Sequence, residues 1–225
     1  MMLGSVFRRL SIRVGASRRQ GLVLVFLSVV LAGCARPAAY GELDKELNRR
    51  QPPDKVLAAA GVRPGLVVGE VGAGWGRYTV EIARRVGPSG RVYANDIDRD
   101  SLEYLQQRCK KAKLTNVEVI IGQEKDPRFP SGVLDMAFMI NTFHHLADSV
   151  ALLRNVCPAL KPGATLVIVE KDPDRAQDHP GHGTTREAMV RLAAEAGFEL
   201  VRIETFLAMD NIYIFRVKLP AGQGR

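Results

Sequence analysis

Residues 66–76 read LVVGEVGAGWG, and this stretch decides the fold. Four mostly apolar residues lead to an acid, Glu70, and a turn with glycine at positions 72, 74 and 76 follows. A helical pattern, RYTVEIARRV, comes directly after the turn. Parallel α/β proteins bind nucleotide-derived ligands where a buried strand runs through such a turn into a helix. Glycine is needed there because a Cβ atom would block the close approach of the backbone to the ligand.

Two details of the turn distinguish between kinds of ligand. The dinucleotide fingerprint G-x-G-x-x-G requires glycine at position 77, where this chain has arginine. The carboxylate of Glu70 would repel a pyrophosphate, but it suits a ligand that carries an ammonium group and hydroxyls. The turn therefore predicts a nucleoside-derived ligand without phosphates.

The rest of the chain alternates apolar runs with helical patterns. Such alternation predicts a parallel sheet with helices on both faces. The last two runs have no helix between them, so we expect them to form a closing antiparallel hairpin. The final helix is predicted to begin at a capping box, Thr184-x-x-Glu187. The expected strands are residues 66–71, 91–96, 117–122, 133–140, 164–170, 199–206 and 211–219.

These motifs resemble the class I S-adenosylmethionine-dependent methyltransferases over about residues 52–219. The resemblance implies an α/β, doubly wound, mostly parallel seven-stranded sheet, the Rossmann-like methyltransferase fold, in its small methyltransferase-domain branch. It also implies that S-adenosylmethionine is the cofactor and that its methyl group moves by SN2 transfer to an acceptor. Besides the glycine turn, the carrying motifs are VYANDID (92–98), GQEKDPRFP (122–130), FMINTFHHL (138–146) and LKPGATLVIVE (160–170).

The resemblance and the residue chemistry together assign the cofactor contacts. Glu70 would act through water or backbone on the methionine ammonium, and Asp96 would accept hydrogen bonds from both ribose hydroxyls. Asp98 is the second candidate for the ribose, and either acid is alternatively an ordinary turn residue at a strand end. Gln123 stands where the family often has an aspartate, and its amide would bond the adenine amino group. The expected cofactor-binding residues are Glu70, Gly72, Ala73, Gly74, Asp96, Ile97, Gln123 and Asn141.

No residue is firmly assigned as a base, because alignment with an activated sulfonium supplies most of the rate. The catalytic candidates are Asn141, which would lie near the methyl group, and His144 and His145, since a histidine takes a proton readily. Alternatively, the two histidines cap or pack a strand–helix junction. His179 and His182 have an H-x-x-H spacing without a third ligand, so we expect no metal site.

The first 34 residues have the pattern of a bacterial export signal. Five arginines and no acid lie within the first 20 residues, and an apolar run covers 22–32. That run is too short to span a bilayer as a helix. The following LAGC resembles a lipobox, which implies cleavage before Cys34 and lipid on its sulfur; the alternative is an uncleaved anchor or a mispredicted start. We expect a signal peptide over 1–33, a tether over 34–51, the methyltransferase domain over 52–219 and a disordered tail over 220–225.

The positive charge of the chain belongs largely to this signal. The whole sequence has 32 basic and 24 acidic residues, and without the five signal arginines 27 basic residues face the same 24 acids. We therefore expect no nucleic-acid partner. The partners that we expect are a small-molecule acceptor, favoured by the short loops rich in Pro, Gly and His, and the membrane through lipidated Cys34. Cys109 and Cys157 are expected as free thiols or packing residues.

Export conflicts with a cofactor that is made in the cytoplasm. One interpretation is a methyltransferase anchored in the cell envelope, or a cytoplasmic one if the signal is not used. The other is an envelope lipoprotein that keeps the fold as a non-catalytic binding or structural module. Arginine at position 77 disfavours a third, an oxidoreductase. Arg18 and Arg19 before the apolar run resemble a twin-arginine signal, or are an ordinary basic region. The acceptor, the export route and the oligomeric state stay open.

Overall fold

The computed structural model describes residues 36–175 and 183–218. The expected signal peptide, Cys34, the H-x-x-H histidines and the tail over 220–225 lie outside these residues. The chain divides into two compact units, Met1–Leu43 and Asp44–Arg225. Of the first unit, the structure describes only the beginning of one helix. The fold below is that of the second unit.

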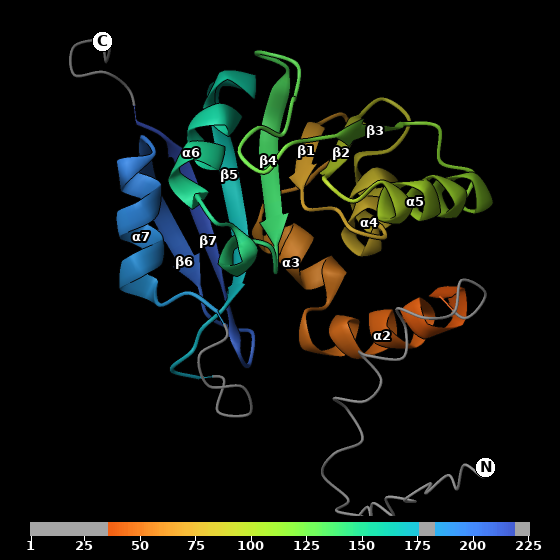
Figure 1. Ribbon diagram of the computed structural model, residues 1–225, viewed down its shortest axis with the longest axis horizontal. Coiled ribbons are helices and arrows are strands. Elements are labelled where there is room, and N and C mark those ends of the chain that lie inside the picture. Colours follow the sequence, from red (N-terminus) through yellow and green to blue (C-terminus); the bar gives the residue numbers. More distant parts are fainter. Residues whose placement is uncertain (1–35, 176–182, 219–225) are drawn as a thin grey trace, which may run out of the picture. The chain divides into compact units, whose positions relative to one another are not determined.

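Seven strands form one sheet in the order β3-β2-β1-β4-β5-β7-β6 (Figure 1). Strands β1 to β5 are parallel, while β7 is antiparallel to both β5 and β6. This confirms the predicted mostly parallel sheet with an antiparallel pair at its end. The strands are β1 Val67–Val71, β2 Arg91–Asp96, β3 Val117–Ile121, β4 Leu134–Ile140, β5 Leu160–Lys171, β6 Phe198–Glu204 and β7 Asp210–Val217.

Helices cover both faces of the sheet, because its buried strands are apolar on both sides. Ala137 and Met139 of β4 pack in the cluster that contains α6 and α7. Met136 and Phe138 of the same strand pack in the cluster that contains α3 and α4. The helices are α2 Arg36–Arg50, α3 Pro53–Ala59, α4 Arg77–Val86, α5 Arg99–Lys111, α6 Ser149–Val156 and α7 Arg186–Glu195, with 3-10 turns η2 Phe143–His145 and η3 Cys157–Ala159.

The predicted capping box at the last helix is wrong by one residue. The N-cap of α7 is Thr185, whose hydroxyl accepts a hydrogen bond from the backbone N–H of Ala188 at 3.2 Å. Thr184 is held elsewhere, because its backbone N–H donates to the carbonyl of Lys171 at the end of β5. The N-cap is thus one position later than predicted.

The segment predicted as a tether is helical and partly built into the second unit. Helix α2 covers Arg36–Arg50, and the second unit begins at Asp44, not at residue 52. Asp44 accepts a hydrogen bond from the indole N–H of Trp75 at 2.8 Å and pairs with Arg108 at 2.8 Å. Polar contacts of this kind hold the helix, and they leave no apolar periodicity in the sequence by which it could be predicted. No helix within the described residues is long and apolar enough to cross a membrane.

Candidate cofactor site

The three glycines of the turn after β1 have different surroundings. All three have positive φ: 70° at Gly72, 52° at Gly74 and 84° at Gly76. A Cβ at Gly72 would lie 2.4 Å from the side chain of Thr142, and one at Gly76 would lie 2.7 Å from Leu105. At Gly74 no protein atom lies within 4 Å of the Cβ position. The turn is therefore packed at its two ends and open in its middle, where a ligand has room to approach the backbone.

Asp96 ends β2 and is hydrogen-bonded to the open part of the turn. Its Oδ2 accepts from the backbone N–H of Gly74 at 2.7 Å, and its Oδ1 accepts from the N–H of Asp98 at 3.0 Å. Each carboxylate oxygen retains a second lone pair, so both can also accept from ligand hydroxyls. The next residue, Ile97, is 61% exposed, which leaves an apolar surface beside this acid.

Asp98, the second ribose candidate, has a different task. It is the N-cap of α5, where its carboxylate accepts from the backbone N–H of Asp100 at 3.1 Å and from the hydroxyl of Ser101 at 2.6 Å. These bonds satisfy the free donors of the first helical turn. The structure therefore separates the two acids: Asp96 lies at the glycine turn, and Asp98 stabilises a helix.

Glu70 lies in the interior, beneath the turn. Its Oε2 accepts from the hydroxyl of Thr79 in α4 at 2.5 Å. Burial raises the pKa of the Glu70 carboxyl to about 7, although the Thr79 hydrogen bond and the charge of Arg77 oppose the rise. Any action of Glu70 on a ligand is therefore indirect.

The remaining predicted cofactor residues lie at the same edge of the sheet. Ala73 donates its backbone N–H to the carbonyl of Asn95 in β2 at 2.8 Å. Gln123 follows β3, is exposed, and exchanges two backbone hydrogen bonds with Asp126. Because β1, β2 and β3 are neighbouring parallel strands, their carboxyl ends place these residues in one row.

Gln51 connects the segment before α3 to the end of β4. Its Oε1 accepts from Arg77 at 2.7 Å and from Asn141 at 2.9 Å, while its Nε2 donates to Asn141 at 2.8 Å and to Asp210 at 2.9 Å. Gln51 is 0% exposed. Asn141 adopts a left-handed backbone with φ 52°, which its amide pair with Gln51 helps to hold.

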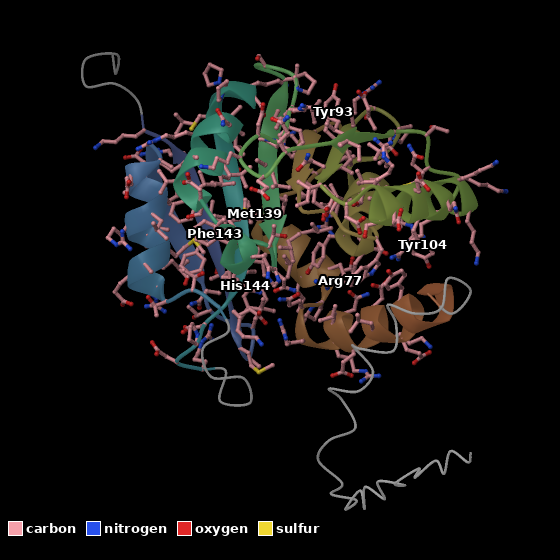
Figure 2. All side chains as sticks on the ribbon, in the orientation of Figure 1. Arg77, Tyr93, Tyr104, Met139, Phe143 and His144 are labelled. Atoms are coloured by element: carbon pink, nitrogen blue, oxygen red, sulfur yellow. The ribbon has the colours of Figure 1, made fainter. Side chains whose placement is uncertain are left out.

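Arg77, the first residue of α4, is a buried cation beside the turn. Its guanidinium carbon lies 4.6 Å from the centre of the Tyr78 ring, and its Nη1 donates to Asn48 at 3.2 Å. Burial lowers the pKa of this guanidinium from its usual value. Figure 2 shows Arg77 and His144 at the same end of the sheet, the end to which the carboxyl termini of the parallel strands point.

Of the histidine candidates, His144 is paired with an acid that the sequence did not single out. Its Nδ1 lies 2.6 Å from Oε1 of Glu170, the buried residue near the end of β5. His145 is exposed, and its ring centre lies 4.0 Å from that of His144. The signal that selected Glu70 and Asp96, an acid near the end of a buried strand, also applies to Glu170.

Two other residues of the site had weaker signals. Gln51 precedes two prolines and Asp210 begins the last strand, and neither position is distinguished by local pattern. Their contacts join parts of the chain 159 residues apart. Within the described residues, no group of three His, Cys, Asp or Glu side chains is placed to hold a metal ion.

Sequence comparison with known proteins finds similarity to methyltransferases over the part of the chain that contains the glycine turn. Residues 68–163 match the sequence model of a family described as "Methyltransferase domain". A demethylmenaquinone methyltransferase of Geobacillus sp. (strain WCH70) is 29% identical over 109 residues, 48% of this chain and 47% of that protein. A ubiquinone/menaquinone biosynthesis C-methyltransferase of Burkholderia cenocepacia (strain HI2424) is 31% identical over 117 residues, 51% and 46% of the two chains. The chain thus spans about half the length of the curated relatives it matches.

Solved structures extend the similarity to nearly the whole described fold. The crystal structure of a SAM-dependent methyltransferase from Aquifex aeolicus is 27% identical, with a TM-score of 0.69. The match covers 80% of this chain and 98% of that one. Together, the domain match, the relatives and the seven-stranded sheet support a class I S-adenosylmethionine-dependent methyltransferase domain in this chain.

Proposed function

We propose that the chain binds S-adenosylmethionine and transfers its methyl group to a small organic acceptor. The observation that carries the proposal is the bond between Asp96 and the backbone N–H of Gly74. It fixes an acid that accepts hydroxyl hydrogen bonds directly beside the open part of a glycine turn. A nucleoside with free ribose hydroxyls matches this pairing.

The residues of the turn fit the proposed cofactor. The open space over Gly74 admits the edge of a ligand, Asp96 would hold the ribose, and exposed Ile97 offers an apolar surface to the adenine ring. When the carboxyl of Glu70 is ionised, its negative charge favours a cationic ligand over an anionic one. When bound, S-adenosylmethionine supplies an activated methyl group. The chain's own contribution is to fix the two reactants in line and to exclude water.

A small acceptor is supported by the relatives, whose names describe quinone methylation. The loop at η2, between β4 and α6, and residues 172–175 directly after β5 both follow strands that end at the carboxyl edge of the sheet. Asn141 and His144 come from the first of these loops and lie on the acceptor side. We propose that this edge forms the acceptor pocket.

Cofactor binding is tested by calorimetry with S-adenosylmethionine and S-adenosylhomocysteine. We expect Asp96→Asn to weaken binding tenfold to hundredfold, since a hydrogen bond to a charged group contributes about 1.5–3 kcal/mol. Asp98→Asn is the matched control, because asparagine caps a helix as well as aspartate does, and its affinity should stay within about twofold of the wild type. A wild-type protein that binds neither compound overturns the proposal.

Calorimetry together with a methyl-transfer assay separates the enzyme from the alternative, a non-catalytic module in the cell envelope. The signal-like amino terminus motivates that alternative, and we propose with it that the protein is anchored through Cys34. Cofactor binding without transfer to any acceptor favours a binding module, and absence of binding favours a structural one. Methyl transfer by protein purified from membranes supports an anchored enzyme.

A further inference from the structure

A histidine and a buried glutamate are paired at the carboxyl edge of the sheet. Nδ1 of His144 lies 2.6 Å from Oε1 of Glu170. The same oxygen accepts the backbone N–H of Lys171 at 3.0 Å, and Oε2 accepts the backbone N–H of His144 at 3.3 Å. The glutamate side chain is 0% exposed and the histidine side chain 18%. The acid is therefore fixed in the interior, while the ring reaches the surface of the edge.

The pairing determines which ring nitrogen is able to accept a proton. A carboxylate only accepts hydrogen bonds, so in the pair with ionised Glu170 the Nδ1–H of His144 is the donor. In the neutral ring the lone pair then resides on Nε2. A buried acid that orients an imidazole in this way is the arrangement found behind general bases.

The pair lies next to the proposed cofactor site. The hydroxyl of Thr142, two residues before His144, lies 3.1 Å from the carbonyl of Ile140 and 3.4 Å from that of Gly72 in the glycine turn. Asn141 precedes Thr142 and is fixed by Gln51. His144 thus lies two residues after Thr142, which contacts the glycine turn, and Figure 2 shows His144 at the same end of the sheet as Arg77.

We propose that His144, positioned by Glu170, is the base that ionises the methyl acceptor, and that the acceptor carries a weakly acidic ring hydroxyl. The inference rests on the proposed function and names its substrate class. A neutral amine attacks a methyl group with its own lone pair and needs no prior base. A phenol ionises near pH 10, so at neutral pH it is a weak nucleophile until its proton is removed.

The proton balance of the step is simple. The O–H bond of the acceptor breaks, its electron pair stays on oxygen, and the proton forms a bond to Nε2 of His144. Glu170 stabilises the resulting imidazolium, which later passes the proton to solvent. In O-methylation the oxygen uses the freed pair to bond the methyl carbon, and the pair of the broken carbon–sulfur bond stays on sulfur. In ring C-methylation the freed pair forms a C=O bond, a ring π pair bonds the methyl carbon, and the proton on that ring carbon is then lost to solvent as the oxygen is protonated again. One base thus serves O-methylation and ring C-methylation alike.

The first test reads the ring itself and needs neither cofactor nor acceptor. Nitrogen-15 NMR of the histidine-labelled protein should show His144 as the Nδ1–H tautomer. In Glu170→Gln the preference should be lost, because an amide can donate to Nδ1 as well as accept from it. An Nε2–H tautomer in the wild type overturns the proposal. Glu118→Gln, an acid-to-amide change in an exposed ion pair with Arg91, is the control and should leave the ring signal unchanged.

The second test varies the acidity of the acceptor. Substituted phenols, a primary amine and a thiol are offered with labelled S-adenosylmethionine. For a phenol that is already ionised at the assay pH, His144→Gln should slow transfer less than about fivefold. For unsubstituted phenol the loss should be about 10²–10⁴-fold, the range of general base catalysis. Glu170→Gln should follow the same trend, whereas damage to the fold alone would slow every acceptor equally.

The outcomes separate this inference from the proposed function. Transfer to the amine or thiol alone, at equal rates in the wild type and His144→Gln, overturns the base and its substrate class but keeps the methyltransferase. A protein that binds no S-adenosylmethionine overturns the proposed function, and the tautomer measurement then stands by itself. If the cofactor binds and no probe is methylated, the NMR measurement decides whether His144 can be the base: the Nδ1–H tautomer supports it, and the Nε2–H tautomer overturns it.

Discussion

The side-chain amides of Gln51 and Asn141 exchange two hydrogen bonds, at 2.8 and 2.9 Å, across 90 residues of sequence. The pair joins the segment before α3 to the end of β4, where the methyl acceptor is expected. Because Gln51 also accepts from Arg77 and donates to Asp210, one amide satisfies several buried groups.

Replacing this amide should therefore destabilise the fold as well as disturb the site. We expect Gln51→Leu to lower the free energy of unfolding by about 2–4 kcal/mol, since it leaves buried polar partners unsatisfied. Gln107→Leu, the same change on the exposed side of α5, should stay within about 0.5 kcal/mol. Urea denaturation measures both. A double-mutant cycle with Asn141→Ala should show a coupling of about 0.5–3 kcal/mol, and additive effects would contradict the pairing.

The glycines of the turn should respond differently to alanine. Gly74→Ala should lose about 1–2 kcal/mol of stability for its left-handed backbone, but its main effect should be on cofactor affinity, weakened tenfold or more. Gly76→Ala meets Leu105 in addition and should lose about 1–3 kcal/mol more. Denaturation and calorimetry on both variants check this. Wild-type affinity in folded Gly74→Ala would show that the ligand does not approach the turn there.

The buried carboxyl of Glu70 should make stability depend on pH. Its pKa is about 7 in the folded chain against 4.5 in the unfolded one, so the folded state holds this proton more tightly. Stability should therefore fall as pH rises from 4.5 through 7. Glu70→Gln lacks this term, and its stability relative to the wild type should improve by up to about 3 kcal/mol between pH 4.5 and 8. Urea titrations at several pH values measure the difference, and a constant difference would be the contrary result.

Lipid attachment is tested at Cys34. In cells fed an alkyne-labelled fatty acid, the wild type should acquire the label and Cys34→Ser should not, because the proposed anchor would carry its lipid on that sulfur. Cys157→Ser removes a thiol elsewhere in the chain and should keep the label. An unlabelled wild type would leave the chain without a lipid anchor.

The sequence predicts the fold well where the signals are local. The strand, turn and helix around Gly74 follow from a contiguous pattern, and the acid at position 96 lies at the next strand end. The cap of α7 is Thr185 and not Thr184, whose backbone N–H donates to the carbonyl of Lys171, a contact between elements that no local pattern contains.

The site was less predictable because its polar contacts are distant in sequence. The partners of Gln51 are 26, 90 and 159 residues away, and those of Arg50 are 160 away. A polar segment looks unstructured when its partners are not visible, so residues 34–51 resembled a tether. Glu170 lies near the end of a buried strand, as Glu70 and Asp96 do, so that signal was available, but its partner His144 is 26 residues away in the sequence.

The boundary of the folded unit has a practical consequence for anyone who shortens this chain. A gene cut at residue 52, where the prolines suggest a natural start, would encode a protein without Asp44, Arg50 and Gln51. Arg77 would then lose its acceptor on Gln51, and Asp210 would lose its donors on Gln51 and Arg50. Trp75 would lose the carboxylate that accepts its indole N–H. Such a protein would be judged insoluble or inactive for reasons unrelated to its chemistry, so expression should start well ahead of residue 44.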